Sequence, residues 1–168
     1  MRIAKAKNVT PDERKLVEKW TKRCLREMSK REHEITNFRG KQVVLKDLQA
    51  GLSVYVKGRG QCSYGGRDQI TIDVRSCDSR TTRGRYNEYK ALADDPTIGS
   101  IDVATQEQCI AVVVAHEVAH HIQYRYGPHT RWLSKAYRKP HGQGFQDIYR
   151  ILRRNVVNPF IEAESSAA

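Results

Sequence analysis

One stretch in the second half of the chain constrains the fold more than any other, because it is apolar on almost every side. It reads CIAVVVAHEVAHHI and covers residues 109–122. Thr105 and Gln108 before it resemble a capping box, and Gly127-Pro128 after it stops a helix, so we expect a helix from 105 to about 126. A helix that is apolar all round packs at the centre of a domain. The rest of the chain must therefore wrap around it.

Two further patterns predict elements that precede this helix. Thr10-Pro11-Asp12-Glu13 combines an N-cap, a proline at the first helical position and a glutamate three residues after the cap. Apolar residues then recur at helical spacing, so we expect a helix over about 11–31. The segments 52–57 and 69–74 are rich in β-branched residues, and the glycine-rich connection between them favours a hairpin or meander. For residues 43–48 the sequence does not distinguish a short strand from a helical turn.

The last third of the chain predicts a closing helix. Over 141–154 apolar residues recur at core spacing, whereas 161–168 is polar and is expected to be a flexible tail. Residues 75–100 are polar and turn-rich, and we expect a long surface excursion that gates a cleft. Together these elements fit one α+β domain over 1–160, with a small three-stranded sheet or meander.

Three polar residues interrupt the apolar helix, namely His116, Glu117 and His120. Histidines four residues apart lie on one face of a helix, where two imidazole nitrogens can bind one zinc ion at about 2.0–2.1 Å. Burying this much polarity requires a partner, and a metal ion supplies one. Glu117 lies one residue further round, where it reaches a water molecule at the metal rather than the metal, the position of a general base. We therefore predict a Zn2+ site with Glu117 as catalytic residue.

A catalytic zinc site needs a third protein ligand, and the chain offers several donors downstream. The metzincin spacing fails, because Gln123 and Tyr126 stand where glycine and histidine are required. His121 points about 100° away round the helix. His141 opens the closing helix beside two glycines that allow close packing, so we predict it as the third ligand, with His129 as the alternative. The remaining donors considered are Asp147, Glu162 and Glu164.

The spacing of these residues resembles a known family. H-E-x-x-H at 116–120 followed by H-G-x-x-F at 141–145 looks like the SprT-like zinc metallopeptidase domain, the kind found in Spartan. The resemblance is specific over 116–145 and architectural over about 10–110. It implies a zincin-like fold and an endopeptidase that degrades proteins crosslinked to DNA. The residues it assigns are the zinc ligands His116, His120 and His141 and the catalytic base Glu117.

For such an enzyme we expect a protein or peptide substrate to lie extended along an edge strand of the sheet, for which we take 69–74. The candidates to stabilise the oxyanion beside the metal are Tyr64, Tyr137 and Arg138. Three other functions stay open. One is a nucleic-acid-binding protein with structural zinc. Another is an antirestriction-type factor, phage- or plasmid-encoded, that uses the same domain with little or no peptidase activity, and the third is hydrolysis of a non-peptide amide.

The net charge of +11 favours a nucleic-acid partner. Basic residues interleave with Tyr86 and Tyr89, a composition that suits single-stranded DNA. The basic residues predicted to contact it are Arg75, Arg80, Arg83, Arg85 and Lys90, together with the basic N-terminal helix. The longest apolar run, Ile110–Ala115, is too short to cross a bilayer. Because the first residues contain no apolar run, we expect no secretory signal. We expect a monomer in the cytoplasm, associated with the nucleoid, or in the host cytoplasm if the chain is phage-encoded.

Overall fold

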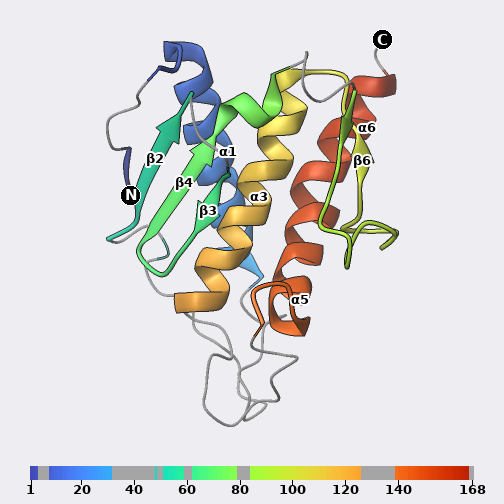
Figure 1. Cartoon of the computed structure of the whole chain (residues 1–168). Coiled ribbons are helices and arrows are strands. Elements are labelled where there is room, and N and C mark those ends of the chain that lie inside the picture. Colours follow the sequence, from blue (N-terminus) through green and yellow to red (C-terminus); the bar gives the residue numbers. More distant parts are fainter. Residues whose placement is uncertain are drawn as a thin grey trace, which may run out of the picture.

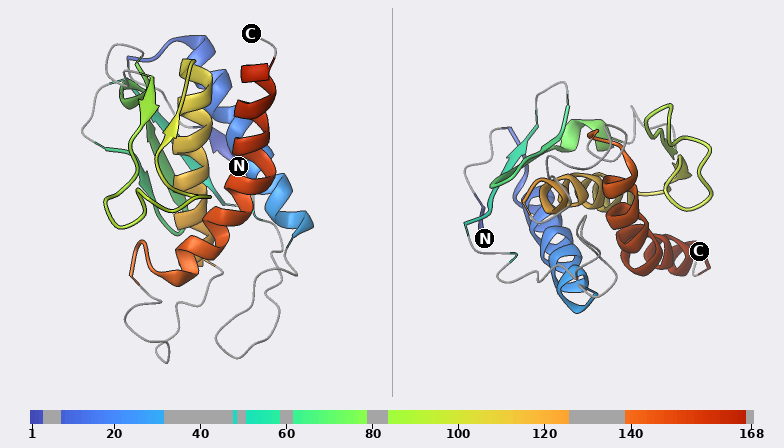
Figure 2. Two further views of the ribbon diagram at one scale, coloured as in Figure 1. Left: turned by 90° about the vertical axis from the view of Figure 1, so that its right-hand side faces the viewer. Right: turned by 90° about the horizontal axis from the view of Figure 1, so that it is seen from below.

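The computed structural model describes residues 1–3, 8–31, 48, 51–58, 62–78, 84–125 and 139–166. It is a mixed α+β structure in which one helix, α3, stands between a sheet and the C-terminal helices (Figure 1). Helix α1 runs along α3 behind the sheet, and the view from below separates the three helical columns (Figure 2). In the part of the chain described, no helix is both long and apolar enough to cross a bilayer.

Helix α1 spans Pro11–Lys30, which confirms the expected helix. The capping box is complete, because Thr10 Oγ1 accepts from Glu13 N at 3.1 Å and Glu13 Oε2 accepts from Thr10 N at 2.7 Å. One face is buried against the core, and its residues are Val17, Trp20, Thr21, Cys24, Leu25 and Met28. Its other face is polar and lies in solvent, so α1 is an ordinary amphipathic surface helix.

Helix α3 spans Gln106–Arg125 and is also confirmed within a residue. Its start is a variant of the capping box, since Thr105 Oγ1 accepts from Gln108 N at 3.2 Å while Gln108 Oε1 accepts from Ala104 N at 2.6 Å. Every residue from Gln108 to Gln123 is buried. The sheet, α1 and α5 all pack against α3, as an all-round apolar helix demands.

The main sheet corrects the expected meander. Its strands β1 (Arg2–Ile3), β2 (Ser53–Lys57), β3 (Tyr64–Gly65) and β4 (Gln69–Asp73) follow the order β1-β2-β4-β3, so it has four strands rather than three. β2 and β4 are parallel, and β3 returns antiparallel on the far side of β4. β4 is therefore an inner strand with residues buried on both faces, and the prediction that 69–74 forms an edge is wrong. The end strand beside α3 is β3.

The segment 84–100 keeps many residues exposed, as expected of a surface excursion, but buried side chains anchor it to the domain. Strands β5 (Arg85–Tyr86) and β6 (Ile101–Asp102) pair antiparallel at its two ends. Between them Leu92 and Ile98 are buried in the core, and Arg150 of α5 holds Asp95 at 2.8 Å. Before it, Val74–Cys77 form a 3₁₀ helix, and residues 79–83 lie outside the described part.

The closing helix begins at Gln143 and is longer than expected. Helix α5 (Gln143–Leu152) continues through a π-helical segment (Arg153–Val157) into α6 (Asn158–Ser166). The helix thus includes 161–166, most of the segment expected to be a flexible tail. Ile161 is buried, and Glu164 accepts a hydrogen bond from Gln108 Nε2 of α3 at 3.2 Å.

Candidate metal centre

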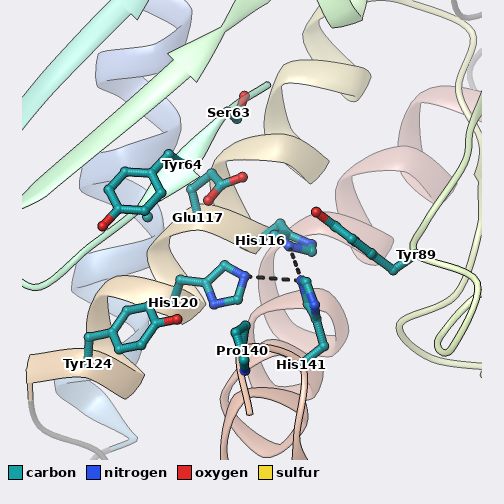
Figure 3. Close-up of a pocket in the computed structure, with 10 residues that line it drawn as sticks. Ser63, Tyr64, Tyr89, His116, Glu117, His120, Tyr124, Pro140 and His141 are labelled. Atoms are coloured by element: carbon teal, nitrogen blue, oxygen red, sulfur yellow. Dashed lines mark hydrogen bonds between the residues drawn. The ribbon is translucent and has the colours of Figure 1, made fainter. Parts of the chain in front are cut away.

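Three histidines converge beside the C-terminal half of α3 (Figure 3). His116 and His120 project from adjacent turns of α3, and His141 lies just before α5. The Nε2 atom of His141 is 3.2 Å from Nε2 of His116 and 3.2 Å from Nε2 of His120. Nitrogen ligands of a tetrahedral zinc ion lie about 3.3 Å apart, because each bond is about 2.0–2.1 Å long. The three donors, all within 4.8 Å of one another, lie close enough to hold one metal ion.

The protonation of these histidines also suits a metal. Burial, and then the neighbouring histidines, lower the pKa of His120 to about 2 and the pKa of His141 to about 4. Both rings are therefore neutral at pH 7 and keep a nitrogen lone pair for coordination. His116 and His120 are buried, with 3% and 7% of their surface exposed. Imidazole nitrogens with free lone pairs are donors that fit a nitrogen-binding metal ion.

A glycine allows the end strand of the sheet to lie directly against the metal-binding turn of α3. A Cβ atom added at Gly65 would lie 2.3 Å from the carbonyl oxygen of Glu117 and 2.7 Å from Cβ of His120. Real side chains do not approach backbone that closely, so only glycine fits at this position of β3. The contact brings the strand and its neighbour Tyr64 to the rim of the centre.

Glu117 faces the same cleft as the histidines (Figure 3). Its burial raises the pKa of its carboxyl to about 7; His116 and the Gly65 N–H act in the opposite direction, and Glu88 adds to the rise. A carboxyl whose pKa lies near neutrality can both accept and return a proton at physiological pH. The structure thus places the predicted base beside the three predicted ligands.

The cleft has a volume of about 220 Å³ and is walled by tyrosines. Tyr64 and Tyr89 are each 59% exposed, and the Tyr89 ring lies 4.0 Å from the His141 ring, centroid to centroid. Of the residues expected to stabilise an oxyanion, Tyr64 lines the cleft, whereas Tyr137 and Arg138 fall outside the described residues. Tyr89 and Tyr124 also line it, and sequence reasoning had not assigned either to the centre.

Glu88 is the main residue that the sequence did not reveal. Its side chain is fully buried, and its Oε1 and Oε2 lie 3.2 Å and 3.3 Å from Nδ1 of His116. Tyr149 OH donates to Oε2 at 3.0 Å, and the Tyr89 N–H donates to Oε1 at 2.9 Å. Burial would raise the pKa of Glu88, but the hydrogen bonds and charge of His116, with the other two donors, lower it overall. Glu88 is thus held as a carboxylate beside a candidate ligand.

The other donors considered from the sequence lie away from the centre. Asp147 is half exposed and accepts from Gln143 Nε2 at 2.6 Å. Glu164 bonds Gln108 at the opposite end of α3. His121 is fully buried, with Nδ1 3.1 Å from the carbonyl oxygen of Gly66. His129 lies outside the described residues, so its role stays untested.

The residues predicted to contact DNA are only partly described. Arg80 and Arg83 fall outside the described part, and Arg85 forms an ion pair with Asp102 at 2.7 Å. Several lysines of α1 are also in ion pairs with carboxylates: Lys15 with Asp12, Lys19 with Glu107, Lys22 with Glu18 and Lys30 with Glu27. These pairs reduce the positive charge that α1 presents to a phosphate backbone.

No protein-family model, curated protein or solved structure matches this chain. The arrangement of the histidines, Glu117 and the cleft is therefore the basis on which a function can be assigned.

Proposed function

We propose that the chain is a zinc-dependent endopeptidase of the SprT-like, zincin type that acts on proteins associated with DNA. One observation carries the proposal: three imidazole Nε2 atoms from His116, His120 and His141 converge in an open cleft that also contains Glu117. A structural zinc site is closed by four protein ligands, whereas a catalytic site has three and keeps a position open. Among the residues described, the cluster has three donors.

Zinc is the metal we propose, because a compact set of three imidazoles suits it. When bound, zinc would polarise the scissile carbonyl and make water more acidic. Glu117 would take the proton from the attacking water and return it to the leaving amine, as its near-neutral pKa allows. Tyr64 and Tyr89, whose rings flank the cleft, are candidates to contact the substrate carbonyl.

The substrate chain would lie extended beside β3 rather than beside β4. β3 ends the sheet and lies against the turn of α3 that carries Glu117 and His120, so a strand added there would cross the metal centre. The association with DNA is supported by the net charge of +11, which attracts phosphates without regard to sequence. Such an enzyme would act in the cytoplasm, where it meets proteins bound to DNA.

The test compares cleavage by the zinc-loaded wild-type protein with cleavage by Glu117→Gln. The substrates are a basic DNA-binding protein and the chain itself, each with and without single-stranded DNA. We expect cleavage by the wild type, stimulated by DNA, and at least about 1000-fold less by Glu117→Gln with zinc content unchanged, because the variant lacks the proton acceptor. Arg154→Gln, an exposed change on the C-terminal helix, is the control and should cleave at the wild-type rate.

Undiminished cleavage by Glu117→Gln would disprove the mechanism. A wild-type protein that binds zinc and DNA but cleaves nothing would instead favour the binding or antirestriction function.

A further inference from the structure

The three candidate ligands differ in what holds them. Across the described part of the chain, His116 is the one whose second ring nitrogen faces a carboxylate, that of Glu88. The two side chains are 4% and 0% exposed, so no water competes for the contact. A ring nitrogen that faces a carboxylate carries the proton, and this leaves the lone pair on the other nitrogen. For His116 that other nitrogen is Nε2, the atom that points to the centre.

Glu88 is itself held by a buried chain of donors that leads away from the metal centre. Tyr149 OH donates to Glu88 Oε2 at 3.0 Å, and Arg153 Nη1 donates to the Tyr149 oxygen at 3.0 Å. Arg153 is 2% exposed and lies in the π-helical segment after α5. Its Nη1 also donates to the Gly99 carbonyl at 3.2 Å, and its Nε donates to Asn158 Oδ1 at 2.9 Å. The positive charge of Arg153 therefore helps to compensate the buried negative charge of Glu88 through the hydroxyl of Tyr149.

We propose that Glu88 is a positioning residue of the metal centre: it fixes His116 as the tautomer with hydrogen on Nδ1, so that Nε2 is free to bind the metal. Tyr149 and Arg153 act through Glu88 by fixing the direction of its carboxylate. Carboxylates that accept from a metal-binding histidine orient the ring and raise its basicity. The inference rests on the metal centre and not on peptidase activity.

Glu88 could instead serve only to attach the segment 84–100 to α5, as Asp95 does through Arg150. A purely structural role predicts a loss of stability without a specific loss of metal affinity. The two roles can be separated by comparison with another hydrogen-bonded glutamate that is partly buried and distant from the histidines. Glu107 supplies it, because its Oε1 accepts from Lys19 Nζ at 2.6 Å and from Trp20 Nε1 at 3.0 Å, far from the histidines.

The experiment measures zinc affinity by competition with a chelator for wild type, Glu88→Gln and Glu107→Gln. We expect Glu88→Gln to bind zinc about 10- to 100-fold more weakly, because an amide orients the ring less well and lacks the charge. Glu107→Gln should lose stability and keep wild-type affinity. Tyr149→Phe, which removes one donor to Glu88, should weaken binding less than Glu88→Gln does. Cobalt-loaded protein should show a shifted visible spectrum for Glu88→Gln and not for Glu107→Gln.

A second measurement needs no metal. Nitrogen NMR shifts of the His116 ring in the metal-free protein should report a proton on Nδ1 in wild type, and a mixture of tautomers in Glu88→Gln or, if that variant does not fold, in Tyr149→Phe. Wild-type affinity in Glu88→Gln, or a wild-type His116 with its proton on Nε2, would overturn the inference. If Glu88→Gln loses zinc affinity but the wild type cleaves nothing, the inference holds and the proposed peptidase is contradicted. If the wild type binds no zinc, both the inference and the proposed peptidase are rejected.

Discussion

Helices α1 and α3 are both twenty residues long and both follow a capping threonine, yet they use polar residues in opposite ways. In α1 six residues are buried, and among them only Thr21 is polar. In α3 sixteen residues are buried, and several of them are polar. The buried polar residues of α3 are Gln108, His116, Glu117, His120, His121 and Gln123.

A buried polar group must find a partner, and the partners on α3 separate two classes of residue. Gln108, Gln123 and His121 contact backbone of the fold itself: Ala104 N–H, the Lys139 carbonyl and the Gly66 carbonyl. The second class, His116, Glu117 and His120, instead faces one cleft. The difference shows that, among the buried polar residues of a central helix, those whose side chains face one common cleft are the candidates for function.

The largest effect that tests this contrast should come from Gly65→Ala, on the strand that packs against α3. The added methyl would meet backbone of Glu117 and Cβ of His120, so α3 or β3 must move. We expect a loss of at least about 3 kcal/mol in the free energy of unfolding, together with reduced zinc content. Urea unfolding and metal analysis would measure both. Lys22→Ala on the exposed face of α1 is the control and should cost under about 0.5 kcal/mol. A Gly65→Ala protein of full stability and zinc content would contradict the tight contact.

Glu117→Gln should stabilise the metal-free protein at alkaline pH. The pKa of Glu117 is raised from 4.5 to about 7 in the folded state, so its contribution to stability is complete below pH 4.5 and is lost as pH rises through 7. Glutamine avoids that loss, and the gain at pH 8 should reach up to about 3 kcal/mol, vanishing below pH 4.5. The measurement is urea unfolding at pH 4.5 and pH 8 in the presence of a chelator.

The control for Glu117→Gln is Glu18→Gln on α1, which breaks an exposed ion pair with Lys22. We expect a small loss of under about 0.5 kcal/mol that decreases at high salt. Equal pH profiles for the two variants would show that Glu117 is no more buried in solution than Glu18.

A smaller effect than those of Gly65→Ala and Glu117→Gln concerns the cap of α1. Thr10→Ala removes the hydroxyl that accepts from Glu13 N, and we expect a loss of about 1 kcal/mol in the free energy of unfolding. Zinc affinity should not change, because the metal-binding end of α3 does not touch this turn. A fall in zinc affinity would mean that α1 and the metal centre are coupled, and the contrast between the helices would then be too simple. Thermal unfolding with and without zinc makes the comparison.

Much of the helical structure could be predicted because its signals are local. Periodicity and caps defined α1 and α3 within a residue or so, and the spacing of His116, His120 and His141 was enough to predict a shared site. The pairing of strands could not be predicted in the same way. The β-branched runs indicate that β2 and β4 are strands. They do not indicate that β2 and β4 pair in parallel, with β3 antiparallel on the other side of β4.

Glu88 was missed for a related reason. It sits in a polar, turn-rich segment 28 residues before His116, and nothing in its neighbourhood marks it as buried. Glu88 is buried by its contact with Tyr149, which is distant in sequence, and by the packing of Leu92 and Ile98. Leu92 and Ile98 are isolated apolar residues in a polar segment, so they do not form a recognisable pattern. Ligands on one helix can be recognised by their spacing in the sequence. A residue that supports a ligand from another element has no fixed spacing from that ligand, so the sequence does not reveal it.

The π-helical segment Arg153–Val157 has a consequence for changes in chain length. A π turn inside a longer helix holds one residue more than the α-helical turn it replaces. Deleting exposed Arg154 would let the helix run on in a single α-helical phase, with Tyr149 still toward Glu88 and Ile161 still toward the core. The same deletion in the middle of α1 would turn every later residue by about 100° and expose its buried face. The C-terminal helix therefore contains a point at which the loss of one residue leaves the buried face in phase.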